Sequence, residues 1–266
     1  SVLSAAALAA TKELKIRIIV HDNNNCGQCR DIVHSFMVAS GHNASIEYRP
    51  NTKDIGGDKN IFKSYLYPLS LCSERSPSLA YQMTLGDDDS LSHEFFQNFI
   101  MAIQDCAHPP SLLVATHEQG KSSLGSLHGE YTSYRHLLLR ARDILPGFPI
   151  FHTLISANII RVGLFSSKLA LDCISTRYSH MYGIMHGLSV CDIQGMRASC
   201  YVVPNMLANV ETSSFVIEHQ KDVDIYREVP FRWAEYFTWL RIQFGICPSE
   251  YDLRKVYTDS DIWPQI

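Results

Sequence analysis

The chain has 266 residues, 46% of them hydrophobic, and a net charge of −4 at pH 7. This length and composition predict one catalytic domain with a sizeable core. The basic residues are scattered, which excludes the continuous positive surface of a nucleic-acid-binding protein, so we expect no nucleic-acid partner. No apolar run approaches the roughly 18 residues that cross a bilayer. The eight cysteines lack the spacing of a disulfide framework, and we therefore expect a cytoplasmic protein.

The first fifty residues alternate between helix and strand. Helix-forming composition at 2–12 leads into a β-branched strand, Leu14–Val20, and the Asn- and Asp-rich stretch His21–Asn25 is typical of a turn. Helical spacing at Asp31–Ser40 and a second strand at Ala44–Arg49 follow. Strands that alternate with helices predict an α/β fold in which helices flank a mostly parallel sheet.

The remaining sequence adds further strands and helices. Apolar runs predict strands at Leu79–Leu85 and Ser111–Ala115, and the Leu- and Arg-rich stretch His128–Leu145 predicts a helix. Proline and glycine residues interrupt the chain before Ile150–Val162. The aromatic stripe of Phe231–Phe244 indicates an amphipathic helix, so we expect the C-terminal portion to be helical.

Two polar clusters stand directly after predicted strands. Asp22–Asn25 follows the first strand, and Gly86–Asp89 follows the strand at Leu79–Leu85. In open α/β sheets, ligands bind outside the carboxyl ends of the strands. We therefore expect both clusters on one edge of the sheet.

The second cluster contains three adjacent carboxylates, Asp87, Asp88 and Asp89. Adjacent like charges are unfavourable unless a cation neutralises them. Mn²⁺ and Mg²⁺ favour oxygen ligands and commonly bind through one or two carboxylates together with substrate phosphates. The triplet therefore suits a metal–diphosphate complex, although acidic surface turns are common and the triplet taken alone favours a solvated turn.

Three blocks of sequence, in their order and spacing, resemble family-two glycosyltransferases, particularly the bacterial enzymes that build O-antigen and related surface polysaccharides. The blocks are Ile18–Asn25, Ile46–Asn51 with Ile55–Ile61, and Tyr81–Asp89. The resemblance implies a GT-A (Rossmann-like) fold with a mixed, mostly parallel sheet flanked by helices. It also implies one domain, 1–266, with a nucleotide-sugar-binding half at 1–120 and an acceptor-side half at 121–266.

By this resemblance, the polar side chains after the strands bind the donor. Asp22, with Asn23 beside it, would accept a hydrogen bond from the nucleobase edge. Asp87 and Asp89 would be the two acids of the DxD motif, which hold Mn²⁺ or Mg²⁺ and the ribose. Asp88 would share either role.

The glycine-rich turn of the second block is implied to approach the diphosphate. Gly56 and Gly57 would permit close approach of the backbone, and Lys59 would reach the phosphates. This family begins with an additional strand, whereas the present chain begins at what reads as the following helix. The resemblance therefore leaves the selectivity for the nucleobase open.

The family is inverting, so the acceptor hydroxyl needs a base. Many relatives use an acidic residue of a Glu-Asp pair at the start of a late helix, and no such pair occurs here. The corresponding stretch, Thr176–Tyr182, predicts a helix start, and its His180 is the first candidate because imidazole titrates near neutral pH. Packing or capping is an equal alternative for His180, and Asp172 and Asp192 are further candidates for the base.

The reaction implied is metal-dependent, inverting transfer of a sugar from a nucleoside-diphosphate sugar to a hydroxyl of a saccharide or lipid-linked saccharide. The metal would neutralise the negative charge that develops on the leaving phosphate. A lipid-linked acceptor would be compatible with peripheral association at the inner face of a membrane.

Other motifs indicate different functions. Cys26 and Cys29 lie between a strand and a helix, as in a thioredoxin-like thiol oxidoreductase. Lys121 lies in a loose match to a phosphate-binding P-loop. The stripe at Phe231–Phe244 could serve a non-catalytic carbohydrate-binding module, and no zinc-site spacing surrounds Cys26 and Cys29.

Overall fold

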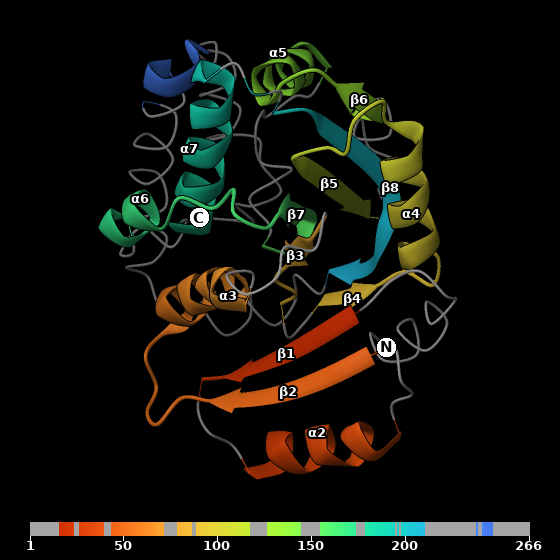
Figure 1. The fold of residues 1–266 in the computed structure, drawn as a ribbon, viewed down its shortest axis with the longest axis vertical. Coiled ribbons are helices and arrows are strands. Elements are labelled where there is room, and N and C mark those ends of the chain that lie inside the picture. Colours follow the sequence, from red (N-terminus) through yellow and green to blue (C-terminus); the bar gives the residue numbers. More distant parts are fainter. Residues whose placement is uncertain are drawn as a thin grey trace, which may run out of the picture.

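The computed structural model describes residues 16–23, 27–39, 44–71, 79–86, 89–117, 127–144, 155–173, 179–194, 196, 198–210, 238 and 241–246. Within these ranges the chain forms a two-stranded sheet and a six-stranded sheet, with helices packed on both (Figure 1). The fold is therefore mixed α/β, as the alternation of strands and helices predicted.

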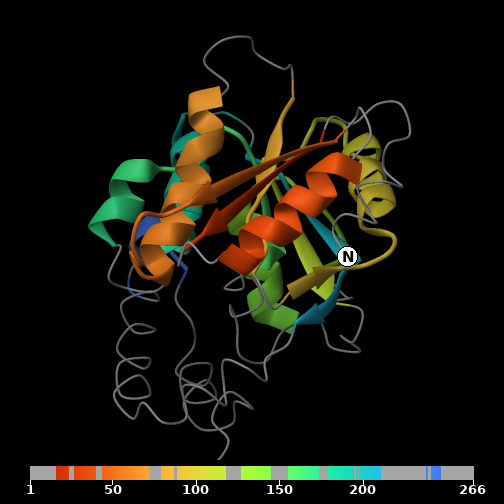
Figure 2. The same ribbon diagram turned by 90° about the horizontal axis from the view of Figure 1, so that it is seen from below.

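The two-stranded sheet is a parallel β–α–β unit. Strand β1 (Ile16–Asp22) pairs with β2 (Ala44–Pro50), in a register that runs from Ile16 opposite Ala44 to Asp22 opposite Pro50. Helix α2 (Gly27–Ala39) makes the crossover and, seen from below in Figure 2, lies across these strands. The predicted strand at Ala44–Arg49 is confirmed, and α2 begins earlier than the predicted Asp31.

Helix α3 (Gly57–Leu71) connects the two sheets. It follows Gly56, whose φ of 80° lies in the left-handed region that glycine adopts without steric penalty. Beyond the two-stranded sheet, α3 contacts α6 (Ser167–Asp172) and α7 (Ser179–Ile193). Its buried Tyr65 stacks on Phe165, with ring centroids 4.7 Å apart.

The six-stranded sheet is mixed, in the order β3-β7-β5-β8-β4, and β6 also pairs with β8. Its strands are β3 (Tyr81–Met83), β4 (Asp89–Leu91), β5 (Leu112–His117), β6 (Gly129–Tyr131), β7 (Asn158–Arg161) and β8 (Cys200–Val210). The ladder between β5 and β8 is parallel, and the other ladders described in this sheet are antiparallel. The sheet is thus less parallel than we expected, because β7 runs antiparallel to both of its neighbours, β3 and β5, and β4 and β6 run antiparallel to β8.

The central strand β5 separates two hydrophobic cores. Leu112 and Val114 face one core and Leu113 and Ala115 face the other, because successive side chains of a strand point to opposite faces. Helix α4 (Phe95–Asp105) covers the second core, and α5 (Tyr134–Ile144) and α7 cover the first. In Figure 1, α4 and α7 accordingly lie on opposite sides of the sheet.

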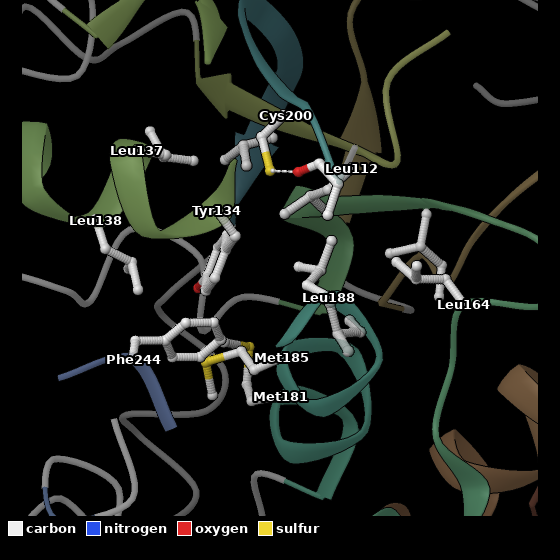
Figure 3. Close-up of a cluster of buried hydrophobic side chains, with 14 of the residues drawn as sticks. Leu112, Tyr134, Leu137, Leu138, Leu164, Met181, Met185, Leu188, Cys200 and Phe244 are labelled. Atoms are coloured by element: carbon white, nitrogen blue, oxygen red, sulfur yellow. Dashed lines mark hydrogen bonds between the residues drawn. The ribbon is translucent and has the colours of Figure 1, made fainter. Parts of the chain in front are cut away.

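The first core is rich in aromatic and sulfur-containing side chains. Figure 3 shows Tyr134 and Phe244 beside Met181 and Met185 of α7. The rings of Tyr134 and Phe244 meet edge to face, with centroids 5.4 Å apart, a favourable geometry for two aromatic quadrupoles. This packing fixes α7 against α5 and the end of the described chain.

Two glycines bring α7 close to the segment that follows β7. A Cβ atom at Gly187 would lie 1.7 Å from the carbonyl oxygen of Leu164, and one at Gly183 would lie 2.4 Å from the ring of Phe165. The backbone N–H of Ser166 donates to the carbonyl oxygen of Gly183 at 3.0 Å. Only residues without a side chain allow this approach.

Some sequence predictions need correction or fall outside the described residues. The helix predicted at His128–Leu145 begins only at Tyr134, because residues 129–131 form β6 against β8. The helix predicted at 2–12 lies outside the described residues. Of the predicted helix at Phe231–Phe244, positions 238 and 241–244 are described, and these are helical. Among the described helices, none is both long and apolar enough to span a membrane.

Candidate functional site

Asp22 ends strand β1 and is nearly buried, with 9% of its surface exposed. The hydroxyl of Tyr48 donates to its carboxylate at 2.6 Å, and the backbone N–H of Asn51 donates to its carbonyl oxygen at 2.8 Å. The hydrogen bond to Asp22 is the main reason that the pKa of Tyr48 rises to about 12. The carboxylate predicted to bind the nucleobase is thus held in one orientation at the carboxyl end of the strand.

Asn51, the residue after β2, is the centre of a polar network. Its side-chain amide donates to the side-chain oxygens of Asn23 at 3.3 Å and Asn60 at 3.0 Å. Its own oxygen accepts from the ammonium group of Lys63 at 2.8 Å. Because Asn51 is 8% exposed, these bonds satisfy an amide that would be costly to bury alone.

The loop before α3 is shaped by the side chains of Asn23 and Asp54. Asn23 donates to the carboxylate of Asp54 at 2.5 Å and accepts from the backbone N–H of Ile55 at 3.1 Å. The N–H of Gly56 donates to the same carboxylate at 2.7 Å. A Cβ atom at Gly56 or Gly57 would meet no atom within 4 Å, so this stretch of backbone is open on the outside.

Two lysines of α3 lie near this loop. The predicted phosphate ligand Lys59 is exposed in the first turn of α3. Lys63, one turn later, is the lysine whose contact with Asn51 joins it to the network. Sequence reasoning missed Lys63, although its spacing from Lys59 places both on one helix face.

Helix α3 also joins the polar network to the strand that precedes the acidic triplet. The side chain of Asn60 donates to the carbonyl oxygen of His21 at 3.3 Å, at the end of β1. The hydroxyls of Ser64 and Thr84 are hydrogen-bonded at 2.8 Å, and Thr84 directly follows β3. Asn60 and Ser64 are one helical turn apart, which is roughly 6 Å along the axis.

Of the acidic triplet, the structure describes Asp89. Asp89 opens strand β4, whereas Asp87 and Asp88 lie outside the described residues. The buried hydroxyl of Ser156 accepts from the N–H of Gly86 at 2.9 Å and donates to the carboxylate of Asp89. The N–H of Asp89 donates to the carbonyl oxygen of Gly86 at 3.3 Å, which closes a four-residue turn.

Contacts of α3 thus link the end of β1 to Thr84, which lies two residues before Gly86 at the start of the acidic turn. Within the described residues, no group of three or more His, Cys, Asp or Glu side chains has the arrangement of a metal site. That description does not include Asp87 and Asp88. Asp89 is the member of the predicted metal set whose position the structure gives.

The candidates for the catalytic base differ in exposure. His180 lies on α7 with 2% of its surface exposed, inside the first core. Asp172, at the end of α6, is exposed. Asp192 is half-buried, and burial raises the pKa of its carboxyl despite a hydrogen bond from the backbone of Ala198. Asp172 is thus the most accessible of the three, and an acceptor could reach His180 only if α7 moved.

A charged cluster lies on the face of the two-stranded sheet opposite the side chains of Asp22 and Tyr48. Glu47 accepts from Arg17 at 2.6 Å and from Arg49 at 2.5 Å, and the guanidinium of Arg49 lies 3.6 Å from the ring centroid of Tyr67. Burial, followed by the charges of Arg49 and Lys63, lowers the pKa of His21. Glu47 thus holds two arginines along this face of the sheet.

The alternative motifs gain no support from the described residues. Cys29 is exposed in the first turn of α2, and Cys26 lies outside the described residues, as does Lys121. Phe244, from the aromatic stripe, is buried against Tyr134. Comparison of the chain with protein-family models, curated proteins and solved structures finds no match.

Proposed function

We propose that the protein is a metal-dependent, inverting glycosyltransferase of the GT-A type. The observation that carries the proposal is a pair of contacts made by α3, in which Asn60 bonds to His21 at the end of β1 and Ser64 bonds to Thr84, two residues before Gly86. These contacts support a donor site that extends from Asp22 toward Asp89. A nucleoside-diphosphate sugar requires this arrangement, because its base, diphosphate and sugar must be held together.

The acidic residues of the chain suit a divalent metal ion that prefers oxygen ligands. Asp87, Asp88 and Asp89 supply carboxylates, and the diphosphate of the donor supplies the other oxygens that Mn²⁺ or Mg²⁺ favours. When bound, the metal would neutralise the charge that develops on the leaving diphosphate. Asp89 is held at the turn by Ser156, which supports its assignment as one of the two acids.

Two lysine side chains of the protein would help to bind the diphosphate. Lys63 lies in the network beside Asn51, and Lys59 is exposed one turn earlier. The open backbone at Gly56 and Gly57 gives a phosphate room to approach the first turn of α3. Asp22 and Asn23 would then hold the nucleobase on the adjoining strand end.

The base that removes the acceptor proton is proposed to be Asp172, or His180 after a movement of α7. Exposure favours Asp172, because a general base must come within hydrogen-bond reach of the proton that it takes. We propose a saccharide or lipid-linked saccharide as the acceptor. The proposed location is the cytoplasm, with peripheral membrane association compatible with a lipid-linked acceptor.

The test is calorimetric binding of UDP, GDP, dTDP and CDP with and without Mn²⁺. We expect one nucleotide to bind with dependence on Mn²⁺, and Asp87→Ala or Asp89→Ala to abolish the Mn²⁺-dependent part. Asp105→Ala is the matched control, because it removes an exposed carboxylate at the end of α4. Sugar transfer from the corresponding donor should follow the same pattern.

Two results would contradict the proposal. Absence of binding by all four nucleotides in the folded parent chain would remove the donor site. Full Mn²⁺-dependent binding and transfer in both Asp87→Ala and Asp89→Ala would remove the metal assignment. Rapid turnover of a disulfide substrate by Cys29 would instead favour the thiol oxidoreductase reading.

A further inference from the structure

The face of the two-stranded sheet that is turned toward α3 carries charged side chains up to the ends of both strands. Alternate side chains of a strand share a face, so Arg17 and His21 of β1 lie on the same side as Glu47 and Arg49 of β2. Tyr67 of α3 covers them, with its ring 6.2 Å from that of His21 and 3.6 Å from the guanidinium of Arg49. His21 and Arg49 are paired at the carboxyl ends of parallel strands, where ligands bind in α/β sheets.

Cations outnumber carboxylates around His21. Burial is the largest cause that lowers the pKa of His21, and the positive charges of Arg49 and Lys63 are the next two. Both cations therefore lie near the imidazole ring, and Glu47 is the carboxylate that acts on the ring in the opposite direction. Because Glu47 also binds Arg17, at 2.6 Å, it cannot neutralise all three cations. Like charges held together in this way are unfavourable unless an anion balances them.

The same three side chains have hydrogen-bond donors to spare. The ammonium group of Lys63 has three N–H donors, and its one hydrogen bond to a described residue goes to the neutral amide oxygen of Asn51. Arg49 uses its Nε and Nη2 atoms within the charged cluster, which leaves Nη1 without a partner among the described residues. The imidazole of His21 likewise makes no hydrogen bond to a described residue. Three elements, β1, β2 and α3, thus each supply a side chain with an unused donor.

Solvent reaches these side chains, so a ligand can reach them too. Lys63 is exposed, the side chain of Arg49 is 42% exposed, and His21 is half-buried. A phosphate group suits the set, because it carries negative charge and presents several acceptor oxygens. Guanidinium groups match phosphate oxygens with a planar fork of donors, whereas an ammonium group binds them as a point charge. A neutral imidazole adds one further N–H donor.

We propose that His21, Arg49 and Lys63 form a phosphate-binding site that needs no metal ion. The proposed occupant is a phosphate group of the sugar nucleotide, and this choice of occupant rests on the proposed function. Free phosphate is the other source of the same chemistry. The site adds His21 and Arg49 to the lysines of α3, and it holds a phosphate by charge and hydrogen bonds alone.

The first experiment measures binding by calorimetry in the presence of a metal chelator. The probes are pyrophosphate, inorganic phosphate and the nucleotides UDP, GDP, dTDP and CDP. We expect the full chain to bind pyrophosphate. A hydrogen bond to a charged group typically changes affinity about 10- to 100-fold, and Arg49→Gln and Lys63→Gln should each weaken binding by that factor. Arg140→Gln and Lys168→Gln are the matched controls, because they remove exposed cations of α5 and α6 and should leave the affinity unchanged.

The second experiment places the anion beside His21. A bound phosphate stabilises the imidazolium form, so it should raise the pKa of His21 against the lowering effect of Arg49 and Lys63. The other groups that face the ring are Glu47 of β2 and Tyr67 of α3. NMR titration of the imidazole protons with and without pyrophosphate, assigned with His21→Gln, measures the shift. An unchanged pKa at saturating pyrophosphate would place the anion elsewhere and overturn the site.

The outcomes separate this inference from the proposed function. If no probe binds without metal, or if Arg49→Gln and Lys63→Gln bind pyrophosphate as the parent does, the phosphate site is wrong, while Mn²⁺-dependent binding of a nucleotide would still support the glycosyltransferase. If pyrophosphate binds through these residues and no nucleotide binds with or without Mn²⁺, the proposed function fails and free phosphate is the occupant. Should Arg49→Gln fail to fold, Lys63→Gln decides, because Lys63 is exposed.

Discussion

The carboxyl ends of β1 and β2 and the helix α7 use polar residues in opposite ways. At the strand ends, Asp22 and Asn51 are nearly buried but are bonded to a network that reaches exposed groups such as Lys63. In α7, His180 lies within a helix that is buried on most of its surface and packs through Gly183 and Gly187. The strand ends thus hold polar side chains in fixed positions next to exposed groups, whereas α7 packs closely against its neighbours.

The surroundings of the candidate residues distinguish them more clearly than their residue types do. Imidazole is the better base near neutral pH, yet its position in α7 keeps His180 from solvent. A carboxylate and several amides are less distinctive in a sequence, yet the network orients them at an open edge. The following predictions test the contrast, beginning with the largest expected effect.

Gly187→Ala should destabilise the fold most. The added Cβ would lie 1.7 Å from the carbonyl oxygen of Leu164, and this backbone atom cannot move away as a flexible side chain can. Overpacking of this kind typically costs about 1–3 kcal/mol, and we expect at least the upper end, measured by urea unfolding. Gly57→Ala is the control, because its Cβ meets nothing within 4 Å, and equal stability of the two variants would refute the close packing of α7.

Asn51→Ala should have an intermediate effect on stability and a clear effect on nucleotide binding. The change removes bonds to Asn23 and Asn60 and leaves their polar atoms without this partner, at a cost of about 1–3 kcal/mol. Unfolding in urea measures the first effect and calorimetry the second. Thr52→Ala, at an exposed neighbouring position, should change neither quantity, and a silent Asn51→Ala would show that the network is incidental.

Asp22→Asn should have the most local effect, which is to lower the pKa of Tyr48 from about 12 toward its ordinary value of 10. Because folding favours the neutral phenol, this contribution to stability is full below pH 10 and is lost as the pH rises from 10 to about 12. Titration of ¹³C-labelled tyrosines by NMR, assigned with Tyr48→Phe, measures the shift. Tyr81 is the internal control, because burial rather than Asp22 raises its pKa to about 12, and a parallel shift of both residues would contradict the assignment.

The local elements of the N-terminal half could be predicted because their signals are local. The β-branched run at β1, the turn residues after it and Gly56 before α3 each act through neighbours in sequence. The expectation that the two polar clusters share an edge followed from the strand-end rule. The contacts of α3 with His21 and Thr84 link the residues that precede the two clusters.

Elements that depend on distant partners could not be predicted. Strands β4 and β6 have three residues each, too few to show a period, and they exist because β8 pairs with them. Ser156 belongs to the site only through the register between β3 and β7, which no local pattern encodes. The burial of His180 depends likewise on how α7 packs against the segment after β7.

Strand β4, which begins at Asp89, can form its ladder only after β8 has been synthesised. Asp89 and Ser90 pair with Val210 and Asn209, which lie far along the chain, whereas the Asp22 network uses residues within the first third of the sequence. During synthesis from the N-terminus, the Asp22 network can therefore form on the ribosome while β4 still lacks its partner. Asp89 gains its strand partner only when β8 emerges, so β4 is completed later than the Asp22 network.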